Sequence, residues 1–233
     1  MNITANLKVM KYKQRGFTLI ELMISIVIGL IILAAVVGMF VTLIKSDNDN
    51  LKSIRLNQQL RAAMSLITRD IRRSGFDGLG TTRGVGPYLF STPVSRLTIG
   101  NNDHGNANSC VGFAYDEDKD GIDDGNPERY GYRWGSDDGA IEIRKSGYAC
   151  DVGGWENFTD ETFIEIFSET IAGVTHPGVE FGETETCNAG MHIRQIAVTI
   201  RGRLRKDNTV SRTISETVKI RNEDTGLVPG PCP

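Results

Sequence analysis

The densest group of side chains that could bind a ligand lies at residues 116–124, where the sequence reads DEDKDGIDD. Carboxylates recur there at steps of two, and Gly121 permits a sharp turn. This is the layout of a calcium loop, because Ca²⁺ takes about six to eight oxygen ligands and Asp is short enough to converge them. The candidate ligands are Asp116, Asp118, Asp120, the carbonyl of Ile122, and Asp124.

The loop departs from an EF-hand at its twelfth position. Pro127 stands where a bidentate Glu is needed, and Glu128 comes one residue late. No helical pattern flanks the segment, so the predicted loop lies within a sheet. Two interpretations stay open, a Ca²⁺ site and a solvated acidic turn without metal. No organic cofactor is predicted.

A second unusual feature is the junction between a basic arm and an apolar segment. Lys8, Lys11, Lys13 and Arg15 precede Gly16, and the sequence FTLIE at residues 17–21 follows at once. Glu21 is a lone carboxylate at the start of an apolar stretch. An unpaired carboxylate costs free energy in such a place unless another group binds it. A cleaved secretory signal fits poorly, because the apolar run is too long and its small residues lie within it.

Residues 17–44 are predicted to form a membrane helix. From Leu22 to Ile44 no residue is charged, and these residues span roughly 34 Å as a helix, enough to cross a bilayer. The basic arm favours a cytoplasmic position for residues 1–16, so the chain crosses the inner membrane once and its remainder enters the periplasm.

An amphipathic continuation of the helix is predicted for residues 45–75, followed by a β-rich head at 76–233. Gly75 is the expected helix stop, and Arg72 and Arg73 complement the helix dipole. Short alternating or aromatic segments then predict strands at residues 96–99, 109–115, 129–134, 140–145 and 156–159. Residues 196–220 predict a hairpin that turns at 206–208. The apolar stripe of the continuation comprises Leu56, Leu60, Ala63, Met64, Ile67 and Ile71.

Charge and cysteine content limit the function of the head. Removing residues 1–16 takes four of the 26 basic residues and none of the 29 acidic ones, so the formal charge becomes −7. Such a domain has no electrostatic reason to bind nucleic acid. Four cysteines fit two disulfides in an oxidising compartment, and of three possible pairings Cys110–Cys150 with Cys187–Cys232 is favoured.

The junction from Arg15 to Met23, RGFTLIELM, resembles the prepilin processing motif of type IV pilins and type II secretion pseudopilins. The resemblance implies an α+β pilin-like fold, with the long N-terminal helix packed on an antiparallel sheet. It also implies that prepilin peptidase cuts between Gly16 and Phe17 and methylates the new N-terminus. Glu21 would then pair with the N-terminus of a neighbouring subunit during assembly.

Further motifs resemble the PilW class of minor type IV pilins. They are RDIRRSGF at residues 69–76, ERYGYR at 128–133, GWE at 154–156 and VKIRN at 218–222. The resemblance implies a low-copy subunit that primes pilus assembly and then reaches the pilus at the cell surface. Its implied partners are other minor pilins, the major pilin, prepilin peptidase, the inner-membrane assembly platform and a tip adhesin.

Two alternative functions share the same N-terminal features. One is a type II secretion minor pseudopilin of the J class, and the other is a surface adhesin that uses the pilin helix as an anchor. An enzyme is not predicted, because His104, His176 and His192 lie far apart and no Ser or Cys stands in a nucleophile context beside them.

Overall fold

The computed structural model describes residues 16–78, 97–147, 149–188 and 191–220. The chain divides into two compact units, residues 1–50 and residues 51–233. One helix, α1 (Leu19–Arg73), contains most of the described residues of the first unit and forms the first element of the second. The helix was predicted to run from residue 17 to 74, so its observed bounds lie slightly inside that range.

In the first unit, α1 is apolar and lacks protein cover. Every residue from 16 to 48 is exposed, although most side chains from Leu22 to Ile44 are large and hydrophobic. Within the described residues, α1 is the one helix whose length and composition would allow it to cross a membrane. A surface of this kind is stable when lipid or other protein segments replace water around it.

In the second unit, one face of α1 is buried. All six residues of the predicted apolar stripe are at most 4 % exposed, which confirms the periodicity of the continuation. The helix ends where predicted, because Gly75 has φ +74° and donates its backbone N–H to the carbonyl of Ala114 at 2.9 Å. Its positive φ suits glycine at a helix C-terminus.

The first sheet of the head has five antiparallel strands in the order β1-β2-β3-β4-β5. The short 3₁₀ helix η1 (Asn126–Glu128) leads into β3. The strand bounds are β1 (Thr98–Gly100), β2 (Cys110–Ala114), β3 (Arg129–Gly135), β4 (Ala140–Arg144) and β5 (Glu156–Asn157). Each lies in or beside a segment predicted to be a strand.

The second sheet is built on β10 (Met191–Leu204), which pairs along one side with β11 (Asp207–Lys219). Its other side pairs with β9 (Val179–Asn188) and β6 (Ile164–Ile166). A separate hairpin joins β7 (Glu169–Ile171) to β8 (Val174–His176). The strands β6 to β9 were not predicted.

The predicted β10–β11 hairpin is present, but its turn was placed wrongly. The turn residues are Arg205 and Lys206, and Asp207 already pairs with Leu204. The register shifts between Arg203 and Leu204, because Arg203 pairs with Ser211. This bulge absorbs the extra residues that sequence alternation had assigned to a longer turn.

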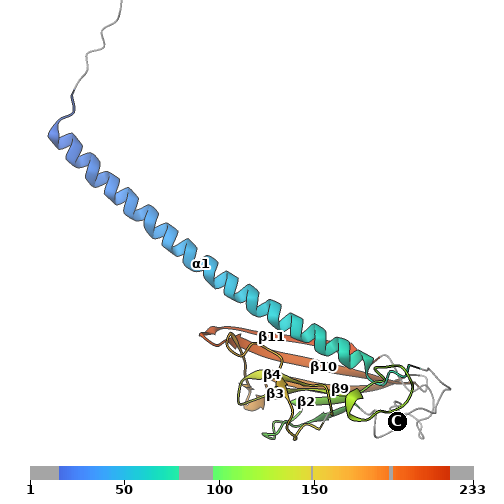
Figure 1. The fold of residues 1–233 in the computed structure, drawn as a ribbon. Coiled ribbons are helices and arrows are strands. Elements are labelled where there is room, and N and C mark those ends of the chain that lie inside the picture. The colour runs from blue at the N-terminus through green and yellow to red at the C-terminus, as the bar shows by residue number, and fades with distance from the viewer. Residues whose placement is uncertain (1–15, 79–96, 148, 189–190, 221–233) are drawn as a thin grey trace, which may run out of the picture. The chain divides into compact units, whose positions relative to one another are not determined.

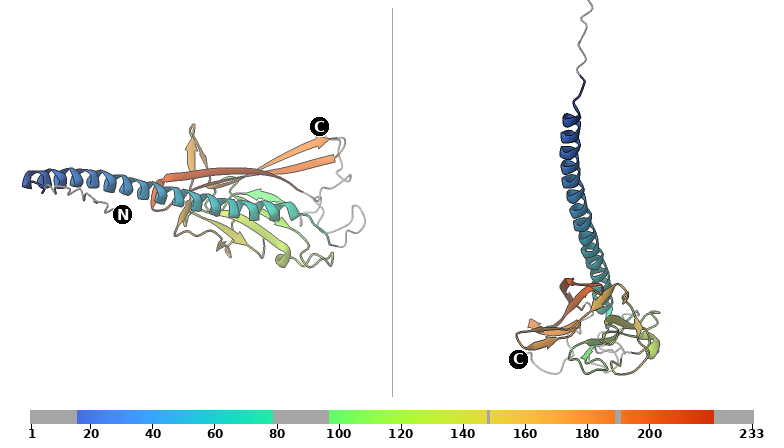
Figure 2. Two further views of the ribbon diagram at one scale, coloured as in Figure 1. Left: turned by 90° about the horizontal axis from the view of Figure 1, so that it is seen from above. Right: turned by 90° about the vertical axis from the view of Figure 1, so that its left-hand side faces the viewer.

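The head core forms where α1 meets both sheets, which lie on either side of this part of the helix (Figure 2). Gly202 of β10 allows close contact, since a Cβ there would lie 2.7 Å from Cδ2 of Leu60. Figure 1 shows β10 and β11 running along the same part of α1. The fold is therefore α+β, with a long helix packed on antiparallel sheets, as the sequence predicted.

Candidate functional site

The N-terminal junction is accessible on all sides. Residues 16–18 have no regular secondary structure, and Phe17 is 88 % exposed. Among the described residues, and apart from the chain neighbours of Gly16, no atom lies within 4 Å of a Cβ built on this glycine. Packing against the described part of the chain therefore does not explain a small residue at the predicted cut.

Glu21 forms a capping box with Thr18 at the start of α1. Its Oε2 accepts hydrogen bonds from the backbone N–H and the hydroxyl of Thr18, both at 3.0 Å. In return, Oγ1 of Thr18 accepts the backbone N–H of Glu21 at 3.3 Å. The spacing Thr-x-x-Glu is the signature of this cap, and the sequence prediction overlooked it. Glu21 therefore has a role within its own chain in addition to the predicted intersubunit pairing.

Three carboxylates converge in the acidic loop. Asp116, Asp118 and Asp120 each offer an oxygen, and these oxygens lie within 4.8 Å of one another. Asp124, which was predicted as a further ligand, lies outside this group. The backbone N–H of Ile122 donates to Oδ1 of Asp120 at 2.7 Å. The structure thus brings together three of the four predicted carboxylate ligands.

Asp116 organises the loop from its buried base. Its side chain accepts hydrogen bonds from the backbone N–H groups of Lys119 at 2.6 Å, Gly121 at 2.9 Å and Gly78 at 2.7 Å. Burial acts to raise the pKa of Asp116, but these three donors outweigh it and hold the pKa below its ordinary value. Asp116 is therefore a structural acceptor as well as a candidate metal ligand.

The two exposed members of the group crowd one another. The backbone N–H of Asp120 acts to lower the pKa of Asp118. Desolvation and the carboxylates of Asp120, Asp124 and Asp116 outweigh it, so the pKa of Asp118 is raised. A cation bound at this point would relieve the repulsion.

Glu128 holds the loop closed, and its carboxylate already accepts backbone hydrogen bonds. It is 3 % exposed, and its carboxylate accepts the backbone N–H groups of Glu117 and Asp124, each at 3.0 Å. Position thirteen of the loop thus holds the two ends of the turn together. An EF-hand uses a Glu at position twelve as a metal ligand, whereas Glu128, at position thirteen, has a structural role here.

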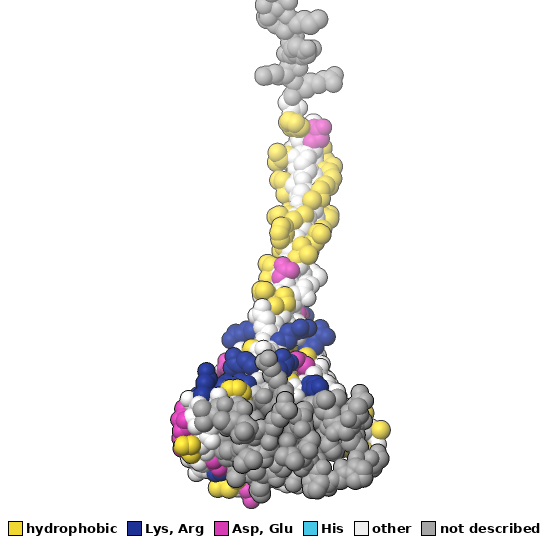
Figure 3. All heavy atoms as spheres, turned by 90° about the vertical axis from the view of Figure 1, so that its right-hand side faces the viewer, with side chains coloured by type: hydrophobic (Ala, Val, Ile, Leu, Met, Phe, Trp, Pro, Cys, Tyr) yellow, Lys and Arg dark blue, Asp and Glu magenta, His cyan; other side chains and the backbone are white. Residues whose placement is uncertain are grey.

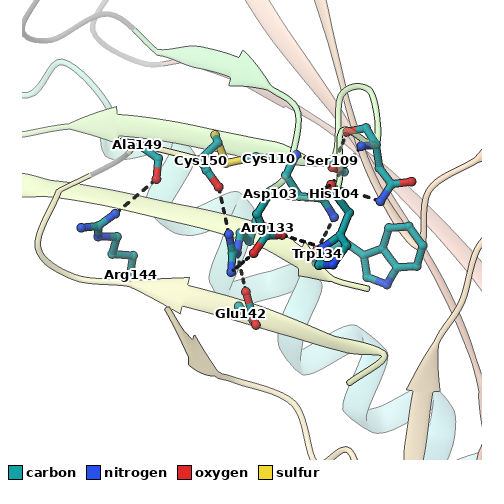
Figure 4. Close-up of a disulfide and its surroundings, with 12 residues drawn as sticks. Asp103, His104, Ser109, Cys110, Arg133, Trp134, Glu142, Arg144, Ala149 and Cys150 are labelled. Atoms are coloured by element: carbon teal, nitrogen blue, oxygen red, sulfur yellow. Dashed lines mark hydrogen bonds and ion pairs between the residues drawn. A yellow bond between two sulfur atoms is a disulfide. The ribbon is translucent and has the colours of Figure 1, made fainter. Parts of the chain in front are cut away.

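The disulfide Cys110–Cys150 joins β2 to the segment before β5, with a Cα–Cα distance of 5.9 Å (Figure 4). Beside it, the Arg133 guanidinium lies between the carboxylates of Asp103 and Glu142 and donates to the carbonyl of Cys150 at 2.9 Å. These contacts tie the central strand β3 to β4 and to the segments that contain Asp103 and Cys150. The second predicted pair, Cys187–Cys232, lies outside the described residues, which do not include Cys232 or the side chain of Cys187.

Two histidines for which the sequence predicts no catalytic role, and the buried Trp134, lie in structural surroundings. His104 contacts Asp103 at 2.9 Å and Asp137 at 3.2 Å, and His176 contacts Glu180 at 3.2 Å. Trp134 is buried and donates from Nε1 to the carbonyl of Ile166 at 3.0 Å. Within the part of the chain that the structure describes, these contacts join elements of the head to one another.

Taken together, the exposed apolar helix, its prepilin-type junction and the antiparallel head define a pilin-like protein. The prokaryotic N-terminal methylation motif matches residues 11–37. The family described as prepilin peptidase-dependent protein B matches residues 49–220, well over half of the 233-residue chain, and the chain belongs to this family. No curated protein matches the chain significantly. No solved structure does so either.

These matches support a structural subunit of the pilin or pseudopilin type, processed by a prepilin peptidase and held in a membrane by its N-terminal helix. The match over residues 49–220 covers most of the head, where the resemblance to the PilW class was seen. The description of the matched family does not name that class, so assignment to the PilW class remains a prediction.

Proposed function

We propose that this protein is a minor pilin that takes part in type IV pilus assembly, as a member of a priming or tip complex. The observation that carries the proposal is the position of the methylation motif, residues 11–37, at the start of a helix whose first unit is apolar and exposed. Cleavage at Gly16–Phe17 would leave this helix at the N-terminus of the mature chain.

The proposed location follows from the same helix. The basic arm before Gly16 stays in the cytoplasm, and the helix crosses the inner membrane once, so the head lies in the periplasm. Extraction into a pilus then carries the head to the cell surface. The proposed partners are prepilin peptidase, the inner-membrane assembly platform, other minor pilins, the major pilin and a tip adhesin.

Mass spectrometry of the membrane-associated protein tests the processing step. We expect an N-terminus at Phe17 carrying a methyl group, and we expect Gly16→Leu to leave the full precursor. Because no described residue beyond its chain neighbours lies within 4 Å of a Cβ at Gly16, Gly16→Leu should leave head folding unchanged. A wild-type protein that keeps Met1 would contradict the proposal.

Gene deletion separates the proposed role from the two alternatives. Loss of all surface filaments supports a priming subunit. Normal filaments with lost attachment would indicate an adhesin, and normal filaments with lost protein secretion would indicate a type II pseudopilin of the J class.

We further propose that the loop at residues 116–124 binds Ca²⁺. Support comes from the convergence of the Asp116, Asp118 and Asp120 oxygens within 4.8 Å. The pKa of Asp118 is consistent with it, because the backbone N–H of Asp120 acts to lower this pKa but desolvation and the neighbouring carboxylates outweigh that N–H and raise it. Bound Ca²⁺ would tie the loop to the segment that follows α1, because Gly78 donates to the same Asp116 carboxylate.

A further inference from the structure

Charge is divided unequally between the helix and the strands of the head. Residues 51–75 contain six Lys or Arg and a single acid, Asp70. Residues 76–233 contain 15 basic and 25 acidic residues, a formal charge of −10. The helical part of this unit is therefore strongly basic, although the unit as a whole is acidic.

The basic residues form one stripe on the exposed side of α1. Arg55, Arg61, Arg69 and Arg72 are all exposed, and Gln58 and Ser65 continue the steps of three and four residues between them. Figure 3 shows Lys and Arg side chains, in dark blue, gathered around α1 at the described surface of the head. The stripe from residue 55 to 72 is about 26 Å long.

The stripe arginines make few contacts that neutralise their positive charge within the described part of the chain. The Arg55 guanidinium lies 4.0 Å from the centre of the Phe163 ring. Arg61 donates to the neutral Oδ1 of Asn57 at 3.3 Å. Arg69 reaches Oδ1 of Asp70 at 3.4 Å, but its side chain is 66 % exposed. The positive charges of Arg61 and Arg69 therefore remain open to a partner in solution.

The surface beside the stripe contains a groove that a partner protein can enter. A groove of about 490 Å³ separates α1 from β11, and its lining includes Arg61, Met64 and Ser65 on the helix and Ile214 on the strand. Arg61 thus stands at the rim of a hollow that also contains apolar atoms. Such a combination of apolar contact and charge is typical of a protein interface.

The densest acidic surface of the same chain lies just beyond the end of the stripe. Residues 116–124 hold six acids and one lysine, and Glu117, Asp118, Asp120 and Asp124 are exposed. Backbone hydrogen bonds tie this loop to the chain that leaves α1, from Gly75 to Ala114 and from Asp116 to Phe76, each at 2.9 Å. The stripe and the loop are therefore offset along the helix axis.

We infer that the basic stripe on α1 binds the acidic loop of a second copy of this chain. A second copy that lies beside the exposed side of α1 and is shifted along the helix by on the order of 10 to 25 Å would bring its loop to the stripe. The contact joins two different surfaces, so two neighbouring copies suffice to form it, which is compatible with a low-copy subunit. The inference rests on the proposed pilin function, because it names the partner of a subunit that assembles side by side with others.

The test uses the full chain in non-ionic detergent micelles with a chelator present, and measures self-association by sedimentation. We expect association at about 50 mM salt that weakens strongly at about 500 mM, since screening shortens the range of charge interactions. The variant Arg61→Glu/Arg69→Glu should associate about tenfold more weakly. Mixing it with Asp118→Lys/Asp120→Lys should restore association, because the reversed charges again face opposite partners.

The matched control is Lys145→Glu/Lys219→Glu, which changes the net charge equally at exposed positions outside the stripe. It should associate like the parent chain. Equal weakening in both variants, or association that ignores salt, would overturn the inference. If the stripe variant self-associates normally but no longer binds phosphatidylglycerol vesicles, the stripe binds lipid and the inference is overturned. None of these results depends on cleavage at Gly16, so the inference and the proposed function fail separately.

Discussion

Tyr132 donates a hydrogen bond from its hydroxyl to Oδ2 of Asp70 at 2.7 Å, and this contact fastens strand β3 to helix α1. Tyr132 is 1 % exposed, and its ring lies 6.3 Å from that of Phe113 in a cluster with Phe158. The bond thus fixes the position of the first sheet against the part of the helix that belongs to the head.

Tyr132→Phe should destabilise the head. The change leaves the partly buried Asp70 carboxylate without this donor, and we expect a loss of about 1 to 3 kcal/mol in the free energy of unfolding. Urea unfolding followed by near-ultraviolet circular dichroism measures it. Tyr130→Phe is the control, because its bond to Glu117 is exposed, and an equal loss in both variants would contradict the role given to Tyr132.

Alkaline pH should destabilise the head. Burial, the largest cause in each case, raises the pKa of Tyr115, Tyr130 and Tyr132 above the ordinary value of about 10. Above that pH the unfolded chain releases protons that the folded chain keeps, so the free energy of unfolding falls as pH rises. Unfolding curves between about pH 8 and 11 should show this fall, and Tyr132→Phe should make it shallower. A stability that stays level over this range would contradict the prediction.

Three substitutions distinguish the two roles of Glu21. If its charge pairs with the N-terminus of a neighbour, Glu21→Gln and Glu21→Ala should both lose incorporation into filaments while processing continues. Thr18→Ala removes the partner in the cap but keeps the charge, so it should assemble. Immunoblots of sheared filaments and of membranes measure both steps. If Thr18→Ala fails and Glu21→Gln assembles, the carboxylate serves the helix cap alone.

Calcium should raise the melting temperature of the head. Binding to the folded state alone contributes about 2.7 kcal/mol when Ca²⁺ stands a hundredfold above its Kd. Asp118→Ala should abolish the shift with little effect in a chelator, whereas Asp116→Ala should destabilise the head in both conditions because three backbone donors lose their acceptor. Titration must reach about 1 mM or more, with Mg²⁺ as the control. If the melting temperature does not shift and no heat of binding is measured at that concentration, the loop is a solvated turn without metal.

Removing the Cys110–Cys150 disulfide should destabilise the head by about 4 kcal/mol, because the bond closes a long loop. Urea unfolding of Cys110→Ser/Cys150→Ser measures the loss. Alkylation of the unreduced, unfolded wild-type chain tests the other predicted pair. No label is expected if Cys187 and Cys232 are also joined, and two labelled thiols would contradict that pairing.

The sequence by itself determined the long apolar helix, the buried stripe of its continuation and the end at Gly75. These features depend on composition, on the 3.6-residue period and on one backbone conformation, all of which are local. The strands β1 to β5 and the last hairpin were also visible, because turn residues bound each alternating segment. The same local pattern contained the Thr18–Glu21 cap, which was overlooked although its spacing was present.

Only the tertiary structure decided how distant segments meet. The strand β9 and the short strands β6 to β8 depend on pairing partners rather than on their own alternation, so they were not predicted. Asp116 looked like a metal-loop position, but it also accepts the backbone N–H of Gly78, which is distant in the sequence. Glu128 accepts backbone N–H groups of its own loop instead. The sheets cover one face of α1 and leave the arginine stripe exposed on the opposite face. Which charges of a helix stay available to a partner depends on this burial, so only the tertiary structure shows it.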